Sequence, residues 1–355
     1  MQLPPPPARS FASDNAAGAH PAVLAAIESA NHGHALAYGD DPWTAACEDA
    51  FRELFGDVTM LLTFNGTGAN VVALGSILGP ADAVVCTEWA HIATDETGAP
   101  ERILGTKLMT RSSPDAKLRP ADIDELAHLI GVVHHAQPAV VSITQSTELG
   151  TVYTPDEVAA VCDAAHRLDM TVHMDGARIA NATAALGADV AALRSFTIDA
   201  GVDVLTFGGT KNGLVGGEAV VFLRPDLARR AQLVRKQVTQ LPSKMRFVAA
   251  QFLALLDDGL WLRLAADANA MAARLYGAVD GLAAIDAGPP PAVNSLYPVL
   301  PTEIIEPLRR WSFFWDWDVA RHQVRWMTAW DTTAEDVERF VAGVTTATQA
   351  VASQN

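Results

Sequence analysis

Short apolar, β-rich runs alternate with helix-like segments over about residues 59 to 223, and this alternation constrains the fold more than any other feature. The expected strands cover residues 59–64, 83–87, 107–111, 139–144, 171–175, 202–208 and 218–223. Helices are expected at 68–78, near 120–130 and at 155–167. This order predicts a mostly parallel sheet with helices on both faces. Ligands bind such sheets beyond the carboxyl ends of the strands, so site residues are expected there.

The two ends of the chain follow different patterns. Residues 1–12 are expected to form an extended arm because positions 4–7 are all proline, and residues 13–42 carry polar turn residues. After about residue 225 come long helical stretches, a Gly-Pro-Pro-Pro break at 288–291, and a smaller α/β unit. In that unit, strands are expected at 294–299 and 324–328, with helices at 301–309 and from Thr333. We expect an N-terminal arm over 1–30, a large domain over 31–255 and a small C-terminal domain over 256–355.

Composition and charge exclude several kinds of partner. The 355 residues include 41 acidic and 25 basic ones, a net charge of −16, which argues against nucleic acid and anionic membranes as partners. The three cysteines, Cys47, Cys86 and Cys162, form neither a disulfide nor a zinc pattern. No signal peptide and no apolar run of 18 residues is visible. We therefore expect a cytoplasmic protein without a metal site.

A glycine-containing loop follows the first expected strand. Gly66, Thr67 and Gly68 lie where a helix begins, and the free N–H groups of a helix start favour an anion such as phosphate. The spacing matches neither a dinucleotide fingerprint nor a Walker loop. A tight turn without any ligand would have the same sequence, so the loop alone is a weak indication.

Two charged residues end later strands. Asp175, in His-Met-Asp-Gly-Ala-Arg, closes a buried strand, and in pyridoxal-phosphate (PLP) enzymes such a carboxylate keeps the pyridine nitrogen protonated. A helix cap or a salt bridge to Arg178 is its alternative role. Lys211 is flanked by glycines that leave room for a ligand, and a desolvated amine loses its proton readily, as Schiff-base formation requires. Together they predict a PLP site more strongly than either does alone.

His91 follows the strand expected at 83–87, where it could stack on a cofactor ring or carry protons. A loop histidine without a role is the alternative.

In this order the motifs resemble the low-specificity L-threonine aldolases of the β-eliminating lyase family, which are fold-type I PLP enzymes. The resemblance rests on segments spread over nearly the whole chain, namely Ser13-Asp14-Asn15, Tyr38-Gly39-Asp40-Asp41, Gly66-Thr67, Ala90-His91, the segments around Asp175 and Lys211, Ser243-Lys244-Met245-Arg246 and Val324-Arg325. It implies an α/β, fold-type I PLP-dependent transferase-like fold. It also implies cleavage of L-threonine, L-allo-threonine or a related β-hydroxy-α-amino acid to glycine and an aldehyde.

The resemblance implies a role for each matching residue. Lys211 would carry PLP as a Schiff base, Asp175 would pair with the pyridine nitrogen, and His91 would stack on the ring and assist proton transfer. The phosphate would be held by Gly66, Thr67 and Gly68. The carboxylate of the amino acid would be gripped by Ser13, Arg178 and Arg325, with Arg178 also close to the cofactor. Arg246 would lie near the cofactor across the interface of a homodimer or homotetramer with shared active sites.

One position departs from the family pattern. Glu148 stands where many threonine aldolases carry a histidine that senses the β-hydroxyl of the substrate, and an ion pair or a helix-cap contact is its alternative role. The general base and the threo or erythro preference therefore stay open.

Other activities on the same scaffold also stay open. They are a phenylserine-type aldolase, a β-eliminating lyase and an amino-acid racemase, with Trp43, Trp89 and Trp330 as candidates for an aromatic pocket. A PLP-free binding protein is disfavoured because Lys211 and Asp175 are both present.

Overall fold

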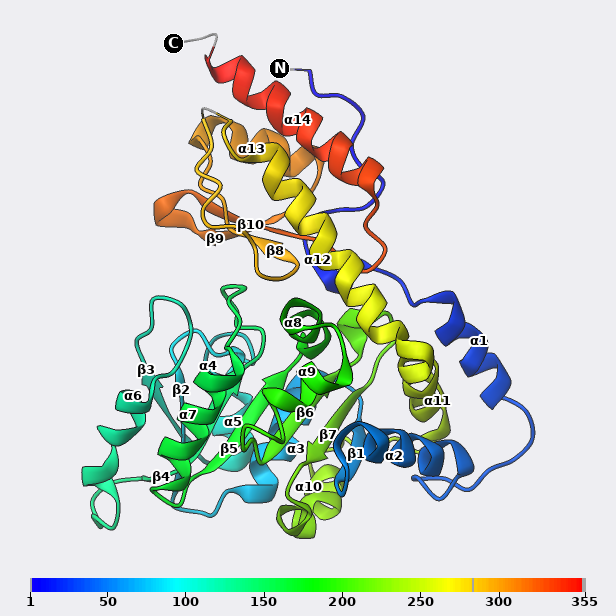
Figure 1. The fold of residues 1–355 in the computed structure, drawn as a ribbon, viewed down its shortest axis with the longest axis vertical. Coiled ribbons are helices and arrows are strands. Elements are labelled where there is room, and N and C mark those ends of the chain that lie inside the picture. The colour runs from blue at the N-terminus through cyan, green and yellow to red at the C-terminus, as the bar shows by residue number, and fades with distance from the viewer. Residues whose placement is uncertain (1, 283, 353–355) are drawn as a thin grey trace.

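The computed structural model describes residues 2–282 and 284–352. It consists of a broad body built on a sheet and a smaller body above it (Figure 1). The broad body contains a seven-stranded sheet with the order β1-β7-β6-β5-β4-β2-β3. Its strands are β1 Thr59–Thr63, β2 Asp82–Thr87, β3 Lys107–Arg111, β4 Gln137–Thr144, β5 Thr171–Gly176, β6 Val204–Gly208 and β7 Glu218–Phe222. The strands expected from the sequence are confirmed, with small differences at their ends.

The directions of the strands bring the carboxyl ends that carry the expected site residues to one edge of the sheet. Strands β6, β5, β4, β2 and β3 are parallel, whereas β7 runs antiparallel to both β6 and β1. These two reversals give β1 the direction of β6, so the loop after β1 lies at the same edge as the ends of β5 and β6. The expected mostly parallel sheet is confirmed.

Helices cover the sheet and include two that the sequence pattern did not indicate. Helix α1 (Pro21–Ala30) lies inside the stretch expected to be polar turns, so that expectation is wrong there. Proline starts this helix, and Val23 and Ala30 are buried against its neighbours. Helix α2 (Pro42–Phe55) begins where Asp41 accepts a hydrogen bond from the backbone N–H of Thr44 at 2.8 Å.

The other helices of the broad body are mostly short connections between strands. They are α3 Gly66–Ile77, α4 His91–Thr94, α5 Ala99–Leu104, α6 Pro120–Asp124, α7 Pro155–His166, α8 Ile179–Leu186, α9 Val190–Ser195, α10 Ala231–Gln237 and α11 Arg246–Leu256. The helices expected at 68–78 and 155–167 are confirmed as α3 and α7, and the one expected near 120–130 is split into α6 and a short 3-10 turn, Ala127–Leu129.

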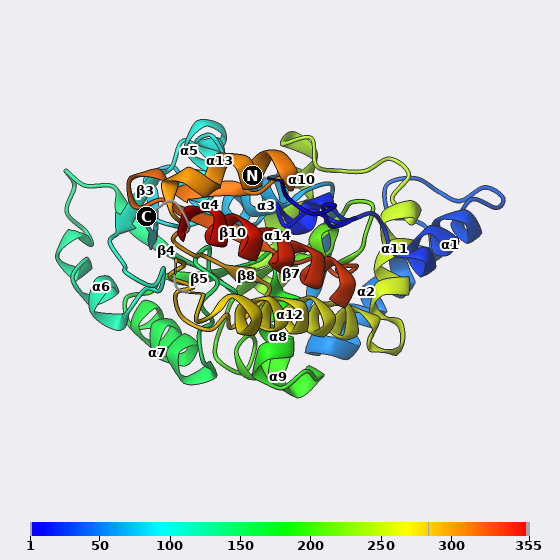
Figure 2. The ribbon, with the colours of Figure 1, turned by 90° about the horizontal axis from the view of Figure 1, so that it is seen from above.

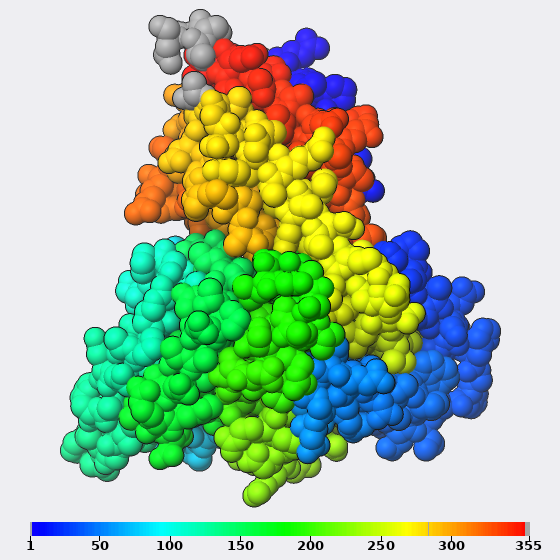
Figure 3. All heavy atoms as spheres, in the orientation of Figure 1, coloured from blue at the N-terminus to red at the C-terminus, as the bar shows by residue number. Residues whose placement is uncertain are grey.

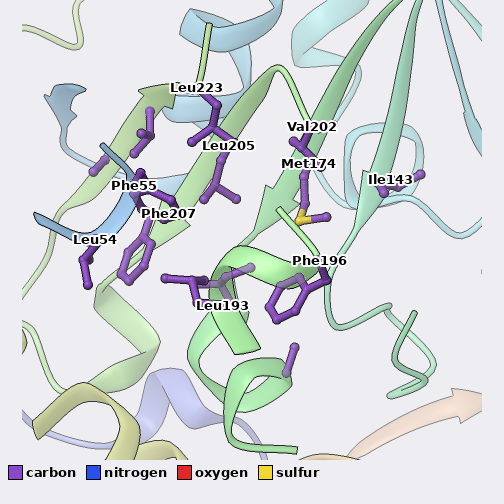
Figure 4. Close-up of a cluster of buried hydrophobic side chains, with 14 of the residues drawn as sticks. Leu54, Phe55, Ile143, Met174, Leu193, Phe196, Val202, Leu205, Phe207 and Leu223 are labelled. Atoms are coloured by element: carbon purple, nitrogen blue, oxygen red, sulfur yellow. The ribbon is translucent and has the colours of Figure 1, made fainter. Parts of the chain in front are cut away.

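A continuous hydrophobic core lies beneath the strands that carry the functional ends. Figure 4 shows Leu205 and Phe207 of β6 facing Leu193 and Phe196, which come from α9 and its end. The Phe207 ring also meets the rings of Phe51 and Trp261 at centroid distances of 5.3 and 5.6 Å. Such close packing holds β5 and β6 rigidly, which matters for any residue at their ends.

The smaller body combines a three-stranded sheet with three helices. Its strands are β8 Ser295–Leu296, β9 Trp315–Asp318 and β10 Gln323–Met327, in the order β8-β10-β9. Its helices are α12 Leu260–Val279, α13 Thr302–Trp311 and α14 Ala334–Ala352. The strand expected at 294–299 is shorter and covers only Ser295–Leu296, although the carbonyl of Pro298 still accepts from the N–H of Val324 at 2.9 Å. Strand β9 was not expected.

Two segments join the bodies. The first part of α12 places Trp261 and Leu264 in the core of the broad body, and its later part places Leu275 and Val279 in the core of the smaller one. The N-terminal segment runs over both bodies, as its blue atoms show in Figure 3. Viewed from above, α12, α13 and α14 lie across the edge of the sheet (Figure 2). Within the described chain, no helix combines the length and apolar character needed to cross a bilayer.

Candidate active site

One pocket at the carboxyl ends of the strands gathers most of the expected site residues. Gly66, His91, Glu148, Asp175, Arg178 and Lys211 all line it. They come from loops after β1, β2, β4, β5 and β6, which the strand directions bring to one edge. The other lining residues are Asn70, Glu96, Thr144, Ser146 and Ala177. We call this space the site pocket.

Asp175 ends β5 and is buried, with both of its carboxylate oxygens hydrogen-bonded. Oδ1 accepts from the backbone N–H of Ala177 at 2.9 Å, and Oδ2 accepts from Nδ2 of Asn70 at 2.9 Å. Burial alone would raise the pKa of this carboxyl, but the charge of nearby His91 and these hydrogen bonds hold the pKa below its usual value. Arg178 forms its salt bridge with Asp14. The alternative role of Asp175, a salt bridge to Arg178, is therefore wrong.

Lys211 lies in the 3-10 turn Thr210–Asn212, directly after β6. Burial and the neighbouring charge of Arg178 lower the pKa of its amine, although three carboxyl groups oppose that shift. The backbone before it must approach β5 closely, because a Cβ at Gly208 would lie 2.5 Å from the carbonyl oxygen of Ala177. The glycine there brings a partly desolvated amine to the pocket beside Asp175.

His91 begins α4, after β2, and is held at both its backbone and its ring. Its backbone N–H donates to Oε1 of Glu148 at 2.7 Å, and its Nδ1 lies 2.9 Å from Oε1 of Glu96. The hydrogen bond with Glu96 raises the pKa of the imidazole despite the opposing effect of burial. His91 is therefore an oriented group at the pocket and not a loose loop residue.

Glu148 is a buried carboxyl with one oxygen committed and one free. Oε1 accepts from the backbone of His91 and from the hydroxyl of Thr144 at 3.0 Å, while Oε2 has no partner among the described residues. Burial and the neighbouring Asp175 raise its pKa to about 7. A proton can therefore move on or off Glu148 near neutral pH.

The N-terminal segment holds Arg178. Nε and Nη2 of Arg178 donate to the two oxygens of Asp14 at 2.7 and 3.0 Å, and Asn294 donates to Asp14 at 3.1 Å. The expected residue Ser13 stands next to Asp14, outside the set that lines the site pocket, and its Oγ accepts from the backbone N–H of Asn15 at 3.1 Å. A pair with two hydrogen bonds of this kind fixes the plane of the guanidinium.

Arg325 lies on β10, outside the set of lining residues. Its Nη2 donates to the carbonyl of Ala12 at 3.3 Å, and its guanidinium lies 5.5 Å from the ring centroid of Trp317. Its Nε is buried with no hydrogen-bond partner in the described chain. Burial first, and then the charge of Arg178, lower its pKa, so the two guanidinium groups lie close enough to repel.

Of the residues expected to hold the phosphate, only Gly66 lines the site pocket, and Arg246 does not line it. Asn65 caps α3 by accepting from the N–H of Gly68 at 2.8 Å. Gly66 faces the site pocket, whereas Thr67 and Gly68 line an adjoining hollow with Gln240. Arg246 lies elsewhere, with its Nη1 3.4 Å from the carbonyl of Gly33 and its guanidinium 5.9 Å from the ring centroid of Trp43.

The tryptophans expected as an aromatic pocket do not come together. Trp89 stacks on Trp317 with a centroid distance of 6.3 Å, beside Tyr297. Trp43 lies under Arg246, and Trp330 donates to the carbonyl of Gly18. Within one subunit these three tryptophans do not form a group, and the aromatic group near Glu148 is formed by Trp89, Trp317 and Tyr297.

Several residues of the site carry no signal in the sequence. Asn70 lies within α3, Glu96 follows α4, and Tyr297 donates to the carbonyl of Glu148 at 2.6 Å from the smaller body. Only folding brings them to the pocket. Asp14 is different, because it belongs to the Ser-Asp-Asn segment and could have been selected with Ser13. Within residues 2–282 and 284–352, no cluster of three or more potential metal ligands occurs.

These residues fit PLP: a desolvated amine, an ionised aspartate, an oriented histidine and a glycine at a helix start share one edge of the sheet. Fold and site together define a fold-type I PLP-dependent enzyme. The model of the β-eliminating lyase family matches residues 10–297, and the chain belongs to this family of PLP-dependent lyases.

Related proteins agree in sequence and in structure. The low specificity L-threonine aldolase of Pseudomonas sp. (strain NCIMB 10558) is 44% identical over 340 residues, covering 95% of this chain and 97% of that protein. The structure of Leishmania major threonine aldolase has a TM-score of 0.87 at 32% identity and covers 95% of this chain and 98% of its own. Oryza sativa TDC, solved with PLP and tryptamine, shares the fold at 14% identity with a TM-score of 0.76, covering 96% of this chain and 84% of its own.

Proposed function

We propose that this protein is a PLP-dependent aldolase that cleaves L-threonine, L-allo-threonine or a related β-hydroxy-α-amino acid to glycine and an aldehyde. The observation that carries the proposal is the site pocket, where Lys211, Asp175, His91 and Glu148 meet in a member of the β-eliminating lyase family. The close sequence similarity to proteins named low specificity L-threonine aldolase supports this substrate class.

The residues that would hold the cofactor follow from their chemistry. The amine of Lys211 would bind the aldehyde of PLP, Asp175 would pair with the pyridine nitrogen, and His91 would cover the ring. Gly66, Thr67 and Gly68 would offer backbone and hydroxyl donors to the phosphate. When bound, PLP supplies a ring that accepts the electron pair released when a bond to Cα breaks.

The substrate would be oriented by its carboxylate and deprotonated at its β-hydroxyl. Ser13, Arg178 and Arg325 would grip the carboxylate, so that the Cα–Cβ bond takes the direction in which it can break. Positioning of this kind can contribute several kcal/mol, on the order of 7 kcal/mol in favourable cases. Glu148, whose free Oε2 belongs to a carboxyl with a pKa of about 7, and His91 are the groups suited to take the hydroxyl proton.

The assembly would be a homodimer or homotetramer with shared active sites, in the cytoplasm. Arg246 supports this arrangement because, within its own chain, it lies over Trp43 and not among the residues that line the site pocket. An arginine in that place could reach the cofactor of a neighbouring subunit. Three buried free cysteines are compatible with a reducing compartment.

A phenylserine-type aldolase is the second candidate, and the aromatic group of Trp89, Trp317 and Tyr297 near Glu148 favours it. Purified protein should be given threonine, allo-threonine and phenylserine in parallel, with glycine and the aldehyde measured. Acetaldehyde from threonine supports the main proposal, and a strong preference for benzaldehyde release supports the second. Pyruvate or a D-amino acid without aldehyde would show a β-eliminating lyase or a racemase.

A further inference from the structure

One buried amide joins two carboxylates of the site. Nδ2 of Asn70 donates to Oδ2 of Asp175 at 2.9 Å and to Oε1 of Glu96 at 2.8 Å. Oδ1 of the same amide accepts from the hydroxyl of Thr206 at 3.1 Å. Both hydrogens of the amide are used, and the opposite orientation would turn its oxygen towards two carboxylates. The position of Asn70 is therefore determined by its surroundings.

Glu96 connects this amide to His91. The same Oε1 that accepts from Asn70 lies 2.9 Å from Nδ1 of His91. A carboxylate accepts hydrogen bonds, so Nδ1 carries the proton and Nε2 is the nitrogen left for exchange with a bound molecule. His91 also faces Asp175 and Lys211 across the pocket, and its backbone is tied to Glu148.

Packing alone does not explain why a carboxyl group is buried at position 96. Its side chain is 0% exposed, and its second oxygen, Oε2, has no partner among the described residues. Burying a carboxylate is expensive unless it is paired, and a glutamine of the same shape could satisfy Asn70 without that cost. Here the charge is directed at the imidazole, where it favours the protonated ring.

We propose that Glu96 is a positioning residue that orients His91 with Nε2 towards the reacting amino acid, and that Asn70 couples this pair to Asp175. One hydrogen-bonded network would then set both the residue that covers the cofactor ring and the residue that contacts its nitrogen. The inference rests on the proposed function, because it assigns the task of Glu96 within that site. Second-sphere carboxylates behind histidines act in this way at many enzyme sites.

The test is the substitution Glu96→Gln, read first by the titration of His91 in the holoenzyme labelled with carbon-13 histidine. We expect the pKa of His91 to fall by about one unit, because the charged acceptor becomes neutral. The limb of the kcat profile that reports His91 should move to lower pH by a similar amount. At neutral pH, kcat should fall by about 100-fold, which is typical for a misplaced general acid or base, with a much smaller change in KM.

A matched control is Glu88→Gln, which makes the same change at an exposed carboxylate three residues before His91. It should leave the His91 titration and kcat unchanged. Glu96→Asp keeps the charge and should restore part of the pKa; if Glu96→Gln does not fold, a lowered His91 pKa in Glu96→Asp supports the proposal. Asn70→Ala should weaken PLP binding, measured by equilibrium dialysis, because two carboxylates then lack their shared donor.

An unchanged His91 titration in the folded Glu96 variant would overturn the proposal, even if turnover fell. That result differs from failure of the proposed function, which would appear as wild-type protein that releases no aldehyde.

Discussion

At the scale of single residues, two buried carboxyl groups with raised pKa values lie near Lys211, Glu148 in the site pocket and Glu218 outside its lining. Glu218, at the start of β7, accepts from the backbone N–H of Gly209 at 2.8 Å, and burial raises its pKa to about 7. Glu148 has the same raised pKa. Both groups therefore bind protons in the folded protein at pH values where the unfolded chain has already released them.

Stability should consequently fall as pH rises from about 4.5 to about 7, because the folded state binds more protons than the unfolded state in that range. Glu218→Gln removes one such titrating group. The change in the free energy of unfolding between these pH values should therefore be smaller by on the order of 1–3 kcal/mol. Urea unfolding at pH 5 and pH 8 measures the difference. Equal slopes for wild type and variant would show that Glu218 is already ionised at pH 5.

If Asp175 pairs with the pyridine nitrogen as proposed, Asp175→Asn removes the negative charge that would keep that nitrogen protonated, with little change in shape. We expect kcat to fall by at least about 100-fold, since electrostatic stabilisation of this kind is worth roughly 3 kcal/mol or more. Bound PLP, quantified after release with alkali, separates loss of chemistry from loss of cofactor. Activity within tenfold of wild type, with PLP bound, would argue against the pairing.

Arg325→Ala should raise KM for the amino acid and lower kcat/KM, by about 2–4 kcal/mol in free energy, because charge-assisted hydrogen bonds to the carboxylate are lost. Arg321→Ala, at an exposed arginine in the turn before β10, is the control and should have no effect. A loss smaller than threefold for Arg325→Ala would count against its role as a carboxylate clamp.

The sequence indicates residues that stand in recognisable motifs at strand ends. Lys211 and Asp175 could be selected because glycines and a buried strand surround them, and the strand order then brings them together. Asn70 and Glu96 could not, since an asparagine inside a helix and a glutamate in a loop have no local pattern that separates them from ordinary polar residues. Their roles arise only from contacts between distant segments.

At the scale of elements, the N-terminal segment acts as a part of the smaller body. Phe11 is fully buried there, with its ring centroid 4.3 Å from that of Phe340, and its carbonyl accepts from the N–H of Met327 at 2.9 Å. A few residues further along, Asp14 holds Arg178 at the pocket. Anchoring of this segment and positioning of Arg178 are thus linked.

Phe11→Ala should destabilise the protein by about 3–5 kcal/mol, the usual cost of removing a buried aromatic ring. It should also raise KM, because Asp14 loses its fixed place. Thermal unfolding and steady-state kinetics measure the two effects. Leu24→Ala, at a half-exposed position on α1, should change stability by no more than about 0.5 kcal/mol; equal losses in both variants would contradict this account.

The helices and strands predicted from the sequence match the structure where the apolar pattern is strong. Six strands of the large sheet are mostly buried apolar runs that composition reveals, whereas the edge strand β3 (Lys-Leu-Met-Thr-Arg) has only exposed and half-buried residues. Helix α1 was hidden because polar residues surround it and its support comes from α11. Strand β9, Trp-Asp-Trp-Asp, lies at an exposed edge, where pairing with β10 and not burial defines the strand.

At the scale of the whole molecule, the proposed sharing of active sites between subunits predicts that two inactive variants complement each other. Lys211→Ala should abolish activity in its own site, and Arg246→Ala should impair the site of its neighbour. Mixed dimers of the two should contain one intact site, so equal mixing should restore about a quarter of wild-type activity if subunits assort freely. No recovery after unfolding and refolding together would show that each subunit works alone.

The contact between Phe11 and Phe340 also has a consequence for how the chain folds during its synthesis on the ribosome. Phe11 is made 329 positions before its partner Phe340. At typical rates of about 5–20 residues per second, the first segment waits roughly 15–65 s for its place. Its four prolines disfavour helix and sheet in the meantime, which favours an extended segment that can still pack against α14 once that helix is made.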